Sequence, residues 1–585
     1  MINPIVTTSN EALSLIHVSR RFESNHRTIQ ALHDISVTIK TGQVTGIIGP
    51  DGAGKTTLIR LISGLLLPDE GQINVLGIDA IASPLEVQSL IGYMPQRFGL
   101  YEDLTVQENL NLYADLQNVA HADRKHRFEE LMHMTGMAPF TKRLAGQLSG
   151  GMKQKLGLAC TLIKSPQLLL LDEATVGVDP VSRRELWDIV YQQVQNSAMT
   201  VLLATAYLDE AERCDDVILL HQGKLIKQDK PEQFSHDVAG RIYQITATGE
   251  RSRALQAELS QALGVLDALV ESETVRVVME TADTPQADIL LPHHKDVLIS
   301  PVTPHFEDAF VAMLKTKPEQ NPAQQSAINT ISTDNDDEVI KVTNLVREFG
   351  DFIAVNKISF SVNRGEIFGL LGANGAGKST TFRMLCGLLP ISSGQLSIAG
   401  KDLRTAAASA RARIGYMAQK FSLYSHLSVQ QNLQFFSSAY GLKSTQQKQR
   451  IDWALTTFEL EDYRNSNAGE LPLGFKQRLS FATALMHEPD ILFLDEPTSG
   501  VDPLARREFW DRTNMLAEKG VTILVTTHFM EEANYCDRLV IMESGEILAS
   551  GTPKELRQKA STQDNADPTM EDTFIQLIEQ KQHVS

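Results

Sequence analysis

The sequence predicts an α/β protein in which one domain occurs twice, with a small and different α/β domain between the two copies. Two observations predict this fold. A glycine-rich loop that follows a short apolar strand and opens a helix occurs at residues 49–57 and again at 372–380. The lysines of the two loops, Lys55 and Lys378, lie 323 positions apart, and later matching pairs keep this offset. An offset shared over about 200 residues indicates an internal repeat.

The repeat divides the chain of 585 residues into five segments. Residues 304–310 and 568–574 share the pattern Pro-x-x-Glu-Asp-x-Phe, so a similar closing helix is expected near the end of each half. Between the copies, Pro, Gln, Asn, Ser and Asp are abundant in a stretch that therefore favours a flexible linker. We expect the first copy at 11–238, the small α/β domain at 239–315, the linker at 316–337, the second copy at 338–557, and a tail with a short helix at 558–585.

Composition limits the classes of function. The formal net charge of −18 argues against a nucleic-acid-binding protein, which normally needs a basic surface. No window approaches the roughly 18 apolar residues of a membrane span, and the first residues lack the features of a secretory signal. We therefore expect a cytoplasmic protein. The scattered cysteines lack a C-x-x-C pair and are expected to be buried thiols; they are Cys160, Cys214, Cys386 and Cys536.

The elements follow in the same order in both copies. A hairpin precedes each glycine-rich loop, and its length differs between the copies because the spacing to the loop differs. A stretch rich in leucine and charge has helical spacing, and two apolar strands follow it. In the small domain we expect strands at 242–247 and 275–279 around a helix at 253–263. The helical stretches are 100–145 and 423–468, and the strand pairs are 168–171 with 201–204 and 491–494 with 523–526.

Both glycine-rich loops fit the pattern G-x-x-x-x-G-K-[ST] of a phosphate-binding loop. Glycines let backbone N–H groups close around the β- and γ-phosphates, and the positive end of the following helix adds to the attraction. The lysine adds a point charge, and the hydroxyl after it is placed for Mg²⁺. The residues expected to contact nucleotide are Gly49, Gly52, Gly54, Lys55, Thr56 and Thr57 in the first loop, and Gly372, Asn374, Gly375, Gly377, Lys378, Ser379 and Thr380 in the second. Asp51 replaces Asn374 in the first loop, and we expect it to face solvent.

An apolar strand in each copy ends in an acidic pair, Asp172-Glu173 and Asp495-Glu496. The aspartate can lie beside Mg²⁺, and the glutamate can polarise the attacking water, which is worth roughly 10²- to 10⁴-fold in rate. A buried strand that ends in acidic residues is common as a purely structural feature. The matching distance from the phosphate-binding loops favours the catalytic interpretation.

These motifs together resemble the nucleotide-binding domains of the ATP-binding-cassette (ABC) family, over about three quarters of the chain. The resemblance implies two P-loop NTPase domains in tandem, each with an α-helical subdomain. Gln96 and Gln419 resemble the Q-loop residues of the family, which reach the metal and the attacking water and lie where a membrane partner docks. Asp179 and Asp502 occur in Gly-Val-Asp-Pro, similar to the D-loop of the family.

An aromatic residue precedes each phosphate-binding loop, Phe22 in the first copy and Phe349 in the second. In the family, an aromatic residue at this place stacks on the adenine. The alternative, a phenylalanine that belongs to the core of a strand, is nearly as well supported by the sequence.

The two copies diverge at the family signature. The first copy has Leu148-Ser-Gly-Gly-Met152, and the resemblance implies that Ser149, Gly150 and Gly151 cap the γ-phosphate that the other copy binds. The second copy has Leu471-Pro-Leu-Gly-Phe475 at this place. Pro472 has neither a hydroxyl nor an N–H group, so this segment is not expected to bind phosphate in the usual way.

The copies also diverge after the last apolar strand. His528 resembles the switch histidine of the family, which contacts the γ-phosphate and orders the water, whereas Ala206 can do neither. If the copies pair head to tail, both defects fall on the first site and the second site is complete. The expected catalytic residues are Glu496, His528, Gln419, Glu173 and Gln96, and the expected Mg²⁺ ligands are Ser379, Gln419, Asp495, Thr56, Gln96 and Asp172.

The resemblance implies an ATPase that uses ATP and Mg²⁺ as the motor subunit of a multidrug or cation exporter. Separate membrane permeases of the ABC-2 type would hold it on the cytoplasmic face of the inner membrane. Two alternatives stay open: the double-cassette ATPase of a sugar importer, and a soluble translation factor that acts on the ribosome. The importer lacks the closing Pro-x-x-Glu-Asp-x-Phe pattern, and translation factors usually have two intact signatures, so the exporter is favoured.

Overall fold

The computed structural model describes residues 10–24, 27–96, 99–271, 273–315, 338–402, 413–419, 421–561 and 568–584. The predicted linker at 316–337 lies outside the described residues. The chain forms two compact units: Met1–Val238 with Pro304–Phe310, and Ala239–Thr303 with Val311–Ser585. The first division therefore falls between Val238 and Ala239, where the sequence predicts the end of the first copy. The small domain groups with the second copy.

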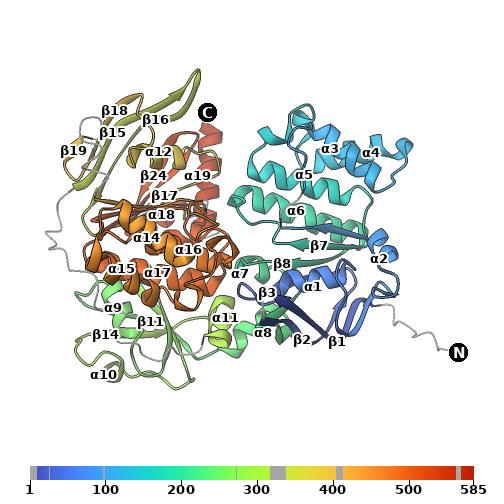
Figure 1. Ribbon diagram of the computed structural model, residues 1–585, viewed down its shortest axis with the longest axis horizontal. Helices are drawn as coiled ribbons and strands as arrows, with labels where there is room; N and C mark the ends of the chain where they lie inside the picture. Colours follow the sequence, from blue (N-terminus) through green and yellow to red (C-terminus); the bar gives the residue numbers. More distant parts are fainter. Residues whose placement is uncertain are drawn as a thin grey trace. The chain divides into compact units, whose positions relative to one another are not determined.

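The first copy contains an antiparallel sheet of order β2-β1-β4-β5 and a mainly parallel sheet of order β10-β9-β3-β8-β7-β6 (Figure 1). Its central strands are apolar along their whole length because helices and the other sheet cover both faces. The strands are β1 (Glu11–Ser24), β2 (Arg27–Lys40), β3 (Val44–Ile48), β4 (Glu70–Val75), β5 (Ile78–Asp79), β6 (Ile91–Met94), β7 (Leu168–Asp172), β8 (Thr200–Ala204), β9 (Asp216–His221) and β10 (Lys224–Asp229).

The helices of the first copy cover the sheets and form the predicted helical segment. A capping box between Thr105 and Glu108 begins α3 at Val106, a few residues after the start of the predicted helical stretch 100–145. The helices are α1 (Lys55–Ile62), α2 (Pro84–Leu90), α3 (Val106–Leu116), α4 (His121–Met134), α5 (Gly150–Leu162), α6 (Pro180–Ser197), α7 (Leu208–Glu212) and α8 (Pro231–Asp237). Short 3₁₀ turns lie at η1 (Ala138–Phe140) and η2 (Ala145–Gln147).

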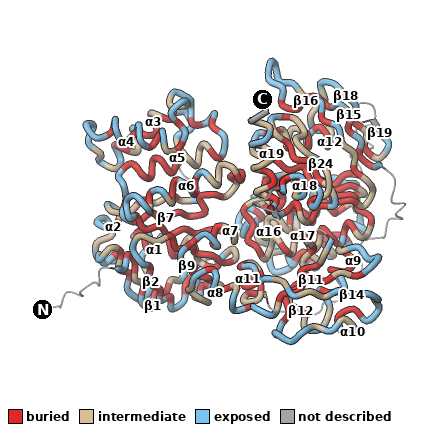
Figure 2. The backbone as a smooth tube through the Cα atoms, turned by 180° about the vertical axis from the view of Figure 1, so that it is seen from behind, coloured by how far each residue is buried: buried red, intermediate tan, exposed pale blue. Residues whose placement is uncertain are grey.

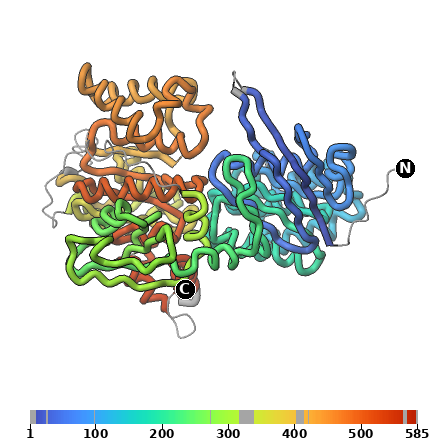
Figure 3. Tube along the Cα trace, turned by 90° about the horizontal axis from the view of Figure 1, so that it is seen from below, coloured from blue at the N-terminus to red at the C-terminus, as the bar shows by residue number. Residues whose placement is uncertain are grey.

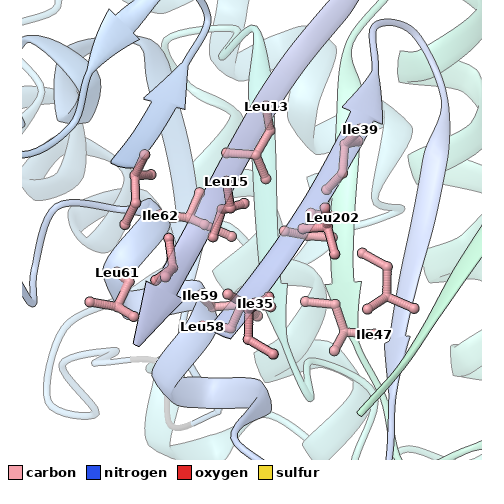
Figure 4. Packing of buried hydrophobic residues seen from close by; sticks show 14 of the residues in the cluster. Leu13, Leu15, Ile35, Ile39, Ile47, Leu58, Ile59, Leu61, Ile62 and Leu202 are labelled. Atoms are coloured by element: carbon pink, nitrogen blue, oxygen red, sulfur yellow. The ribbon is translucent and has the colours of Figure 1, made fainter. Parts of the chain in front are cut away.

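The core of the first copy lies where α1 packs between the two sheets (Figure 4). Leu13 and Leu15 project from β1, Ile35 and Ile39 from β2, and Ile47 and Leu202 from the parallel sheet, toward one face of α1. That face consists of Leu58, Ile59, Leu61 and Ile62, which are all buried. The packing holds α1, and therefore the phosphate-binding loop before it, against the carboxyl ends of the parallel strands.

The second copy repeats this architecture, with sheets of order β16-β15-β18-β19 and β20-β21-β22-β17-β23-β24. The hairpin before the phosphate-binding loop has 12 residues in each strand, against 14 in the first copy, so the predicted difference in hairpin length is confirmed. Figure 3 shows the longer hairpin in dark blue. The strands are β15 (Glu338–Phe349), β16 (Phe352–Asn363), β17 (Ile367–Gly372), β18 (Ser393–Ile398), β19 (Lys401–Asp402), β20 (Ile414–Met417), β21 (Ile491–Asp495), β22 (Thr522–Thr527), β23 (Arg538–Glu543) and β24 (Glu546–Gly551).

The described helices of the second copy occupy the positions expected from the repeat, and burial concentrates on the central strands and the helices packed on them (Figure 2). All four cysteines of the chain are buried, as the sequence predicts. The helices are α12 (Lys378–Leu385), α14 (Val429–Ala439), α15 (Ser444–Thr457), α16 (Leu473–Ala484), α17 (Pro503–Glu518), α18 (Pro553–Ala560) and α19 (Met570–Val584), with 3₁₀ turns η4 (Glu461–Tyr463), η5 (Ala468–Glu470) and η6 (Met530–Tyr535).

The small domain is an antiparallel sheet of order β12-β13-β11-β14 with its own apolar core. The sequence predicts β11, β13 and the intervening helix α9, but it does not predict β12 or β14. In the β12 segment, Asp267 interrupts an otherwise apolar run, a pattern that does not favour a strand. The elements are β11 (Ile242–Ala247), α9 (Ser252–Leu259), β12 (Val265–Glu271), β13 (Thr274–Met279), α10 (Ala287–Leu290) and β14 (Val297–Pro301), followed by α11 (Phe306–Leu314).

The small domain packs on α17 of the second copy (Figures 1 and 3). Buried polar groups make this contact. Asp267 on β12 forms an ion pair with Arg507 on α17, and its other oxygen accepts a hydrogen bond from Lys315 Nζ at 2.5 Å. Gln256 on α9 donates to Asp511 Oδ1 at 2.7 Å and accepts from Asn514 Nδ2 at 2.9 Å. Buried polar groups of this kind require hydrogen-bond partners. The contact between the small domain and α17 therefore depends on matching side chains from both elements.

Asp511 makes the stability of this unit depend on pH. Burial raises the pKa of its carboxyl group to about 6, although Lys315 and Arg507 act to lower it and Glu508 to raise it. A carboxyl group with a raised folded-state pKa contributes stability below its unfolded pKa of about 4, and this contribution is lost as the pH rises through about 6. Asp511→Asn is therefore expected to gain stability relative to the unsubstituted protein between pH 4 and 7.5, by at most about 3 kcal/mol.

Denaturant unfolding of both proteins across this pH range measures the difference. The amide oxygen of the introduced asparagine can still accept from Gln256, so the comparison isolates the carboxyl charge. A difference in unfolding free energy that stays constant from pH 4 to 7.5 would contradict the prediction.

Candidate nucleotide-binding sites

Each phosphate-binding loop joins a central parallel strand to a helix, β3 to α1 and β17 to α12. The glycine before the lysine has positive φ in both loops, 105° at Gly54 and 96° at Gly377. A Cβ atom at either glycine would lie 2.6 Å from a backbone oxygen, that of Ala31 or Ala354. Only glycine fits both the conformation and the close approach, which is why the motif needs it.

The lysine of each loop folds back over the loop backbone. Lys55 Nζ donates to the carbonyl oxygens of Gly49 at 2.8 Å and Pro50 at 3.3 Å. Lys378 Nζ donates in the same way to Gly372 at 2.7 Å and Ala373 at 3.0 Å. Both lysines are buried, so the ammonium group lies inside the cradle where phosphate oxygens are expected.

The strands that end in acidic pairs, β7 and β21, are separated from the strands that lead into the phosphate-binding loops by one strand, β8 or β22. Their acidic pairs still lie at the same edge as the loops, because the carboxyl ends of parallel strands meet at one edge of a sheet. Thr56 Oγ1 donates to Asp172 Oδ1 at 2.9 Å. In the second copy Ser379 occupies the position of Thr56, and Asp495 Oδ1 instead accepts from Thr526 Oγ1 at 2.6 Å. Hydroxyl and carboxylate oxygens are the donors that Mg²⁺ prefers, so both sets fit the predicted metal.

The glutamates that the sequence predicts to be catalytic have left-handed backbone conformations, with φ of 53° at Glu173 and 47° at Glu496. Non-glycine residues avoid this region, at a cost of about 1–2 kcal/mol. The N–H group of each glutamate donates to the next strand, to Ala204 O and Thr526 O, both at 2.9 Å. This anchor holds the unfavourable conformation, as is typical of functional sites.

The Q-loop glutamines contact these glutamates in both copies. Gln96 Nε2 donates to Glu173 Oε2 at 2.6 Å, and Gln419 Nε2 donates to Glu496 Oε2 at 2.6 Å. The structure therefore brings together the residues that the sequence predicts as a catalytic base and its neighbour. Glu173 Oε1 also lies 3.8 Å from Lys55 Nζ.

His528 makes the second site different from the first. Its Nδ1 lies 3.1 Å from Glu496 Oε2, and the side chain is almost completely buried. Both ring nitrogens are buried, and among the described residues neither has a hydrogen bond of good geometry; Nε2 also has no ion-pair partner. A buried nitrogen of this kind normally has a partner, so it fits a role in contacting a bound phosphate. Ala206 in the first copy has no polar side-chain atom.

The two glutamates differ in their ionisation. Burial favours the neutral form of Glu496, but hydrogen bonding and charge from His528, with help from Lys378, outweigh burial, so the pKa of Glu496 is lowered. Burial raises the pKa of Glu173, and Lys55 only partly opposes this rise. The second site therefore favours the carboxylate form that a general base requires.

Asp51 is not directed fully toward solvent. Its Oδ2 atom is buried, and its charge is one of the causes that raise the pKa of Glu173. The expectation that Asp51 faces solvent is therefore wrong for this oxygen. Asn374 at the same place in the second loop brings no charge, so Asp51 adds a further difference between the copies.

The signature segments begin matching helices with different caps. Ser149 is the N-cap of α5, and its Oγ accepts from Met152 N at 3.3 Å. A Cβ atom at Gly151 would lie 2.5 Å from Ser182 Oγ, so that position needs glycine. Pro472 is the N-cap of α16 and makes no side-chain cap. The second copy thus keeps the helix while lacking the hydroxyl that the first presents.

The aspartates of the two Gly-Val-Asp-Pro segments cap helices. Asp179 begins α6 and accepts from Ser182 N at 3.1 Å, while Asp502 begins α17 and accepts from Leu504 N at 3.0 Å and Ala505 N at 3.1 Å. Both carboxylates are buried. Their observed role is to fix the start of each helix, and a direct role in nucleotide binding stays a prediction.

Phe22 and Phe349 lie on β1 and β15 near the ends of the hairpins. Their exposed fractions are 36% and 47%. The alternative that these phenylalanines belong to the core of a strand is therefore excluded. An arginine covers each ring: the guanidinium of Arg20 is 5.0 Å from Phe22 and that of Arg347 is 4.4 Å from Phe349. Adenine stacking on these rings stays a prediction.

Two groups near the sites were not predicted from the sequence. Thr526 supplies the hydroxyl that bonds Asp495, and its counterpart Ala204 cannot. A comparison of the two copies at this pair would have identified it. The second group is a buried glutamate behind each switch segment: Trp187 Nε1 donates to Glu210 Oε1 and Trp510 Nε1 to Glu532 Oε1, both at 3.2 Å.

Within the described part of the chain, no helix is both long and apolar enough to cross a membrane. Sequence comparison agrees with the resemblance stated above. The sequence pattern of the ABC transporter family matches residues 32–176 and 355–499. The matched ranges include both phosphate-binding loops, both acidic pairs and both signature segments.

Curated relatives match almost the whole chain. A protein of Escherichia coli (strain K12) named "Probable multidrug ABC transporter ATP-binding protein YbhF" is 49% identical over 570 residues, which cover 97% of this chain and 98% of that protein. The protein of the same name from Shigella flexneri matches equally. The Nod factor export ATP-binding protein I of Burkholderia orbicola (strain AU 1054) is 43% identical over 218 residues, which cover 37% of this chain and 72% of that protein.

Proposed function

Because the chain belongs to the ATP-binding proteins of the ABC transporter family, we propose that it is the ATP-hydrolysing subunit of an exporter with one complete and one degenerate site. Two tandem ABC domains bind and hydrolyse ATP. The observation that carries the asymmetry is that Glu496 Oε2 lies within reach of both Gln419 and His528. The first copy has Ala206 in place of the histidine.

The proposed reaction is the attack of water on the γ-phosphate of ATP, which yields ADP and phosphate. Glu496 accepts the proton of the water, and Gln419 and His528 hold its carboxylate and the water in place. Lys378 and the loop N–H groups neutralise the β- and γ-phosphates, and the bridging oxygen leaves with ADP. Ser379, Asp495 and Gln419 would hold the Mg²⁺ of the MgATP complex, which supplies charge neutralisation when bound.

In this proposal the first copy binds ATP through Lys55, Thr56 and Asp172 but turns it over slowly. The copies pair head to tail, so that Ser149, Gly150 and Gly151 cap the phosphate of the second site. The exposed N-cap hydroxyl of α5 supports this role.

The direction of transport is proposed from the relatives, which are named for multidrug transport and Nod factor export. ATP-binding proteins of this family work with transmembrane permeases. We propose separate ABC-2-type permeases as partners, a location on the cytoplasmic face of the inner membrane, and a drug or a cation as the transported substrate.

ATP-driven uptake into inverted membrane vesicles tests the export function. Vesicles from cells that produce the protein are expected to accumulate a fluorescent drug after addition of MgATP, because the cytoplasmic face is outside. Vesicles that carry Glu496→Gln are the control and are expected not to accumulate it. Uptake of sugar only in right-side-out vesicles would favour the importer, and salt-resistant sedimentation with ribosomes but not membranes would contradict a transport function.

A further inference from the structure

The small domain follows the first copy in the sequence but contacts the second copy in the structure. The receiving surface consists of Arg507, Asp511 and Asn514 on α17, together with Asp537 before β23. The central pair is well shielded, since the side chains of Asp267 and Arg507 are 3% and 6% exposed. Arg253 of α9 forms an ion pair with Asp537, whose Oδ2 also accepts from Ile367 N at 2.8 Å. Ile367 begins the strand that leads to the phosphate-binding loop.

Helix α17 is physically connected to two segments of the second nucleotide site. It begins directly after Asp502, whose carboxylate caps it. One turn later, the Arg506 guanidinium lies 5.0 Å from the ring of Phe529, and that ring lies 4.1 Å from the ring of His528. Arg506 is the sequence neighbour of Arg507. A shift of Arg507 would therefore move the contact that supports the switch histidine.

The lower part of α17 connects to the same switch segment. Trp510 stacks on Tyr535 of η6 at 4.5 Å and 7°, and its Nε1 donates to Glu532 Oε1. The segment η6 follows His528 and Phe529 directly, and β12 of the small domain also packs on it. The small domain therefore contacts both α17 and η6, the two elements that lie next to the His528 segment.

The first copy has nearly the same residues on its matching surface. Arg184, Asp188 and Asp215 correspond to Arg507, Asp511 and Asp537. The difference is Tyr191, which stands where the second copy has Asn514. Only Asn514 offers an amide donor to Gln256 Oε1, at 2.9 Å, so this residue distinguishes the two surfaces.

We propose that the small domain is a positioning element of the second nucleotide site, and that Asp267 and Arg507 transmit its influence through α17 to the Asp502 loop and His528. Asn514 makes α17, rather than the matching helix of the first copy, the surface that the domain recognises. The proposal rests on the proposed function, in which the second site performs hydrolysis. Its physical basis is that a site with strained residues needs rigid support from the groups packed behind it.

Steady-state ATPase assays of the full chain test this role. Asp267→Asn is expected to lower kcat about fivefold, the size of effect seen for residues that act through a neighbour. The KM for MgATP is expected to stay close to the unsubstituted value, because the phosphate-binding loop is unchanged. Gln256→Ala is a milder variant that keeps the ion pair of Asp267 with Arg507 and removes only the hydrogen bonds to Asp511 and Asn514, and it is expected to lower kcat in the same way but less. Arg184→Gln, at the matching place in the first copy, is the control and is expected to keep the original kcat.

A double variant separates positioning from simple loss of stability. Asp267→Asn combined with Arg507→Gln restores a neutral hydrogen-bonded pair and is expected to recover part of the lost kcat. All variants are assayed well below the unfolding transition that each one shows. Unchanged kcat in both Asp267→Asn and Gln256→Ala, or a loss that appears only in KM, would overturn the positioning role. ATPase activity retained by Glu496→Gln would instead overturn the proposed function itself.

Discussion

Glu496→Gln is expected to abolish steady-state ATP hydrolysis, with a fall in kcat of about 10²- to 10⁴-fold. Glutamine keeps the size of the side chain and its contacts with Gln419 and His528, but it cannot accept a proton from water. Among the described residues of the second site, only the Glu496 carboxylate has a lowered pKa and also contacts both Gln419 and His528. A colorimetric phosphate-release assay of the full chain measures the effect.

The matched change in the first copy is the control. Glu173→Gln is expected to leave much of the activity, because the first copy lacks the histidine and because burial and Asp51 disfavour its carboxylate form. Equal loss of activity from both substitutions would contradict the proposed asymmetry. It would also show that the two sites hydrolyse ATP in an interdependent way.

His528→Ala is expected to lower kcat by about 10²- to 10³-fold, as does the loss of one donor from a site that stabilises developing negative charge. The ring nitrogen Nδ1 lies 3.1 Å from Glu496 Oε2, and the buried Nε2 is proposed to contact the phosphate. Alanine removes both interactions at once. Measurement of kcat and KM for MgATP separates this effect from weakened binding.

Two further variants make the test of His528 specific. His528→Gln can still donate one N–H hydrogen bond and is expected to retain more activity than His528→Ala. Ala206→Ser, at the matching position of the first copy, is expected to leave kcat nearly unchanged. A His528→Ala protein with normal kcat would contradict the assignment of a switch histidine to this site.

Much of the candidate site could be predicted from short motifs, because each motif places its residues locally. The glycine, lysine and hydroxyl of a phosphate-binding loop are consecutive, and the acidic pair directly ends an apolar strand. Comparison of the two copies adds further information. It shows that the first copy has Ala206 where the second has His528, which one copy alone could not show. The contact of Gln419 with Glu496 needed the resemblance, since a glutamine in a turn carries no signal of its own.

Other features could not be predicted because they depend on distant parts of the chain. Asp51 and Glu173 interact across the site, although they are far apart in the sequence. The exposure of Phe22 and Phe349 depends on how far each hairpin extends beyond the sheet that it joins. Strand β12 could not be predicted because the charge of Asp267 interrupts its apolar run. The partners that neutralise this charge, Lys315 and Arg507, are 48 and 240 positions away.

The sequence by itself therefore determined the family and the two copies, and it predicted the candidate residues of both sites and the divergence of the first, because all of these depend on local patterns or on the repeat. Only the tertiary structure decided that the small domain belongs with the second copy. The physical reason is that this choice depends on pairing buried polar groups from separate segments, Asp267 with Arg507 and Gln256 with Asn514. Such a pair is stable only when both partners meet, and neither segment alone indicates its partner.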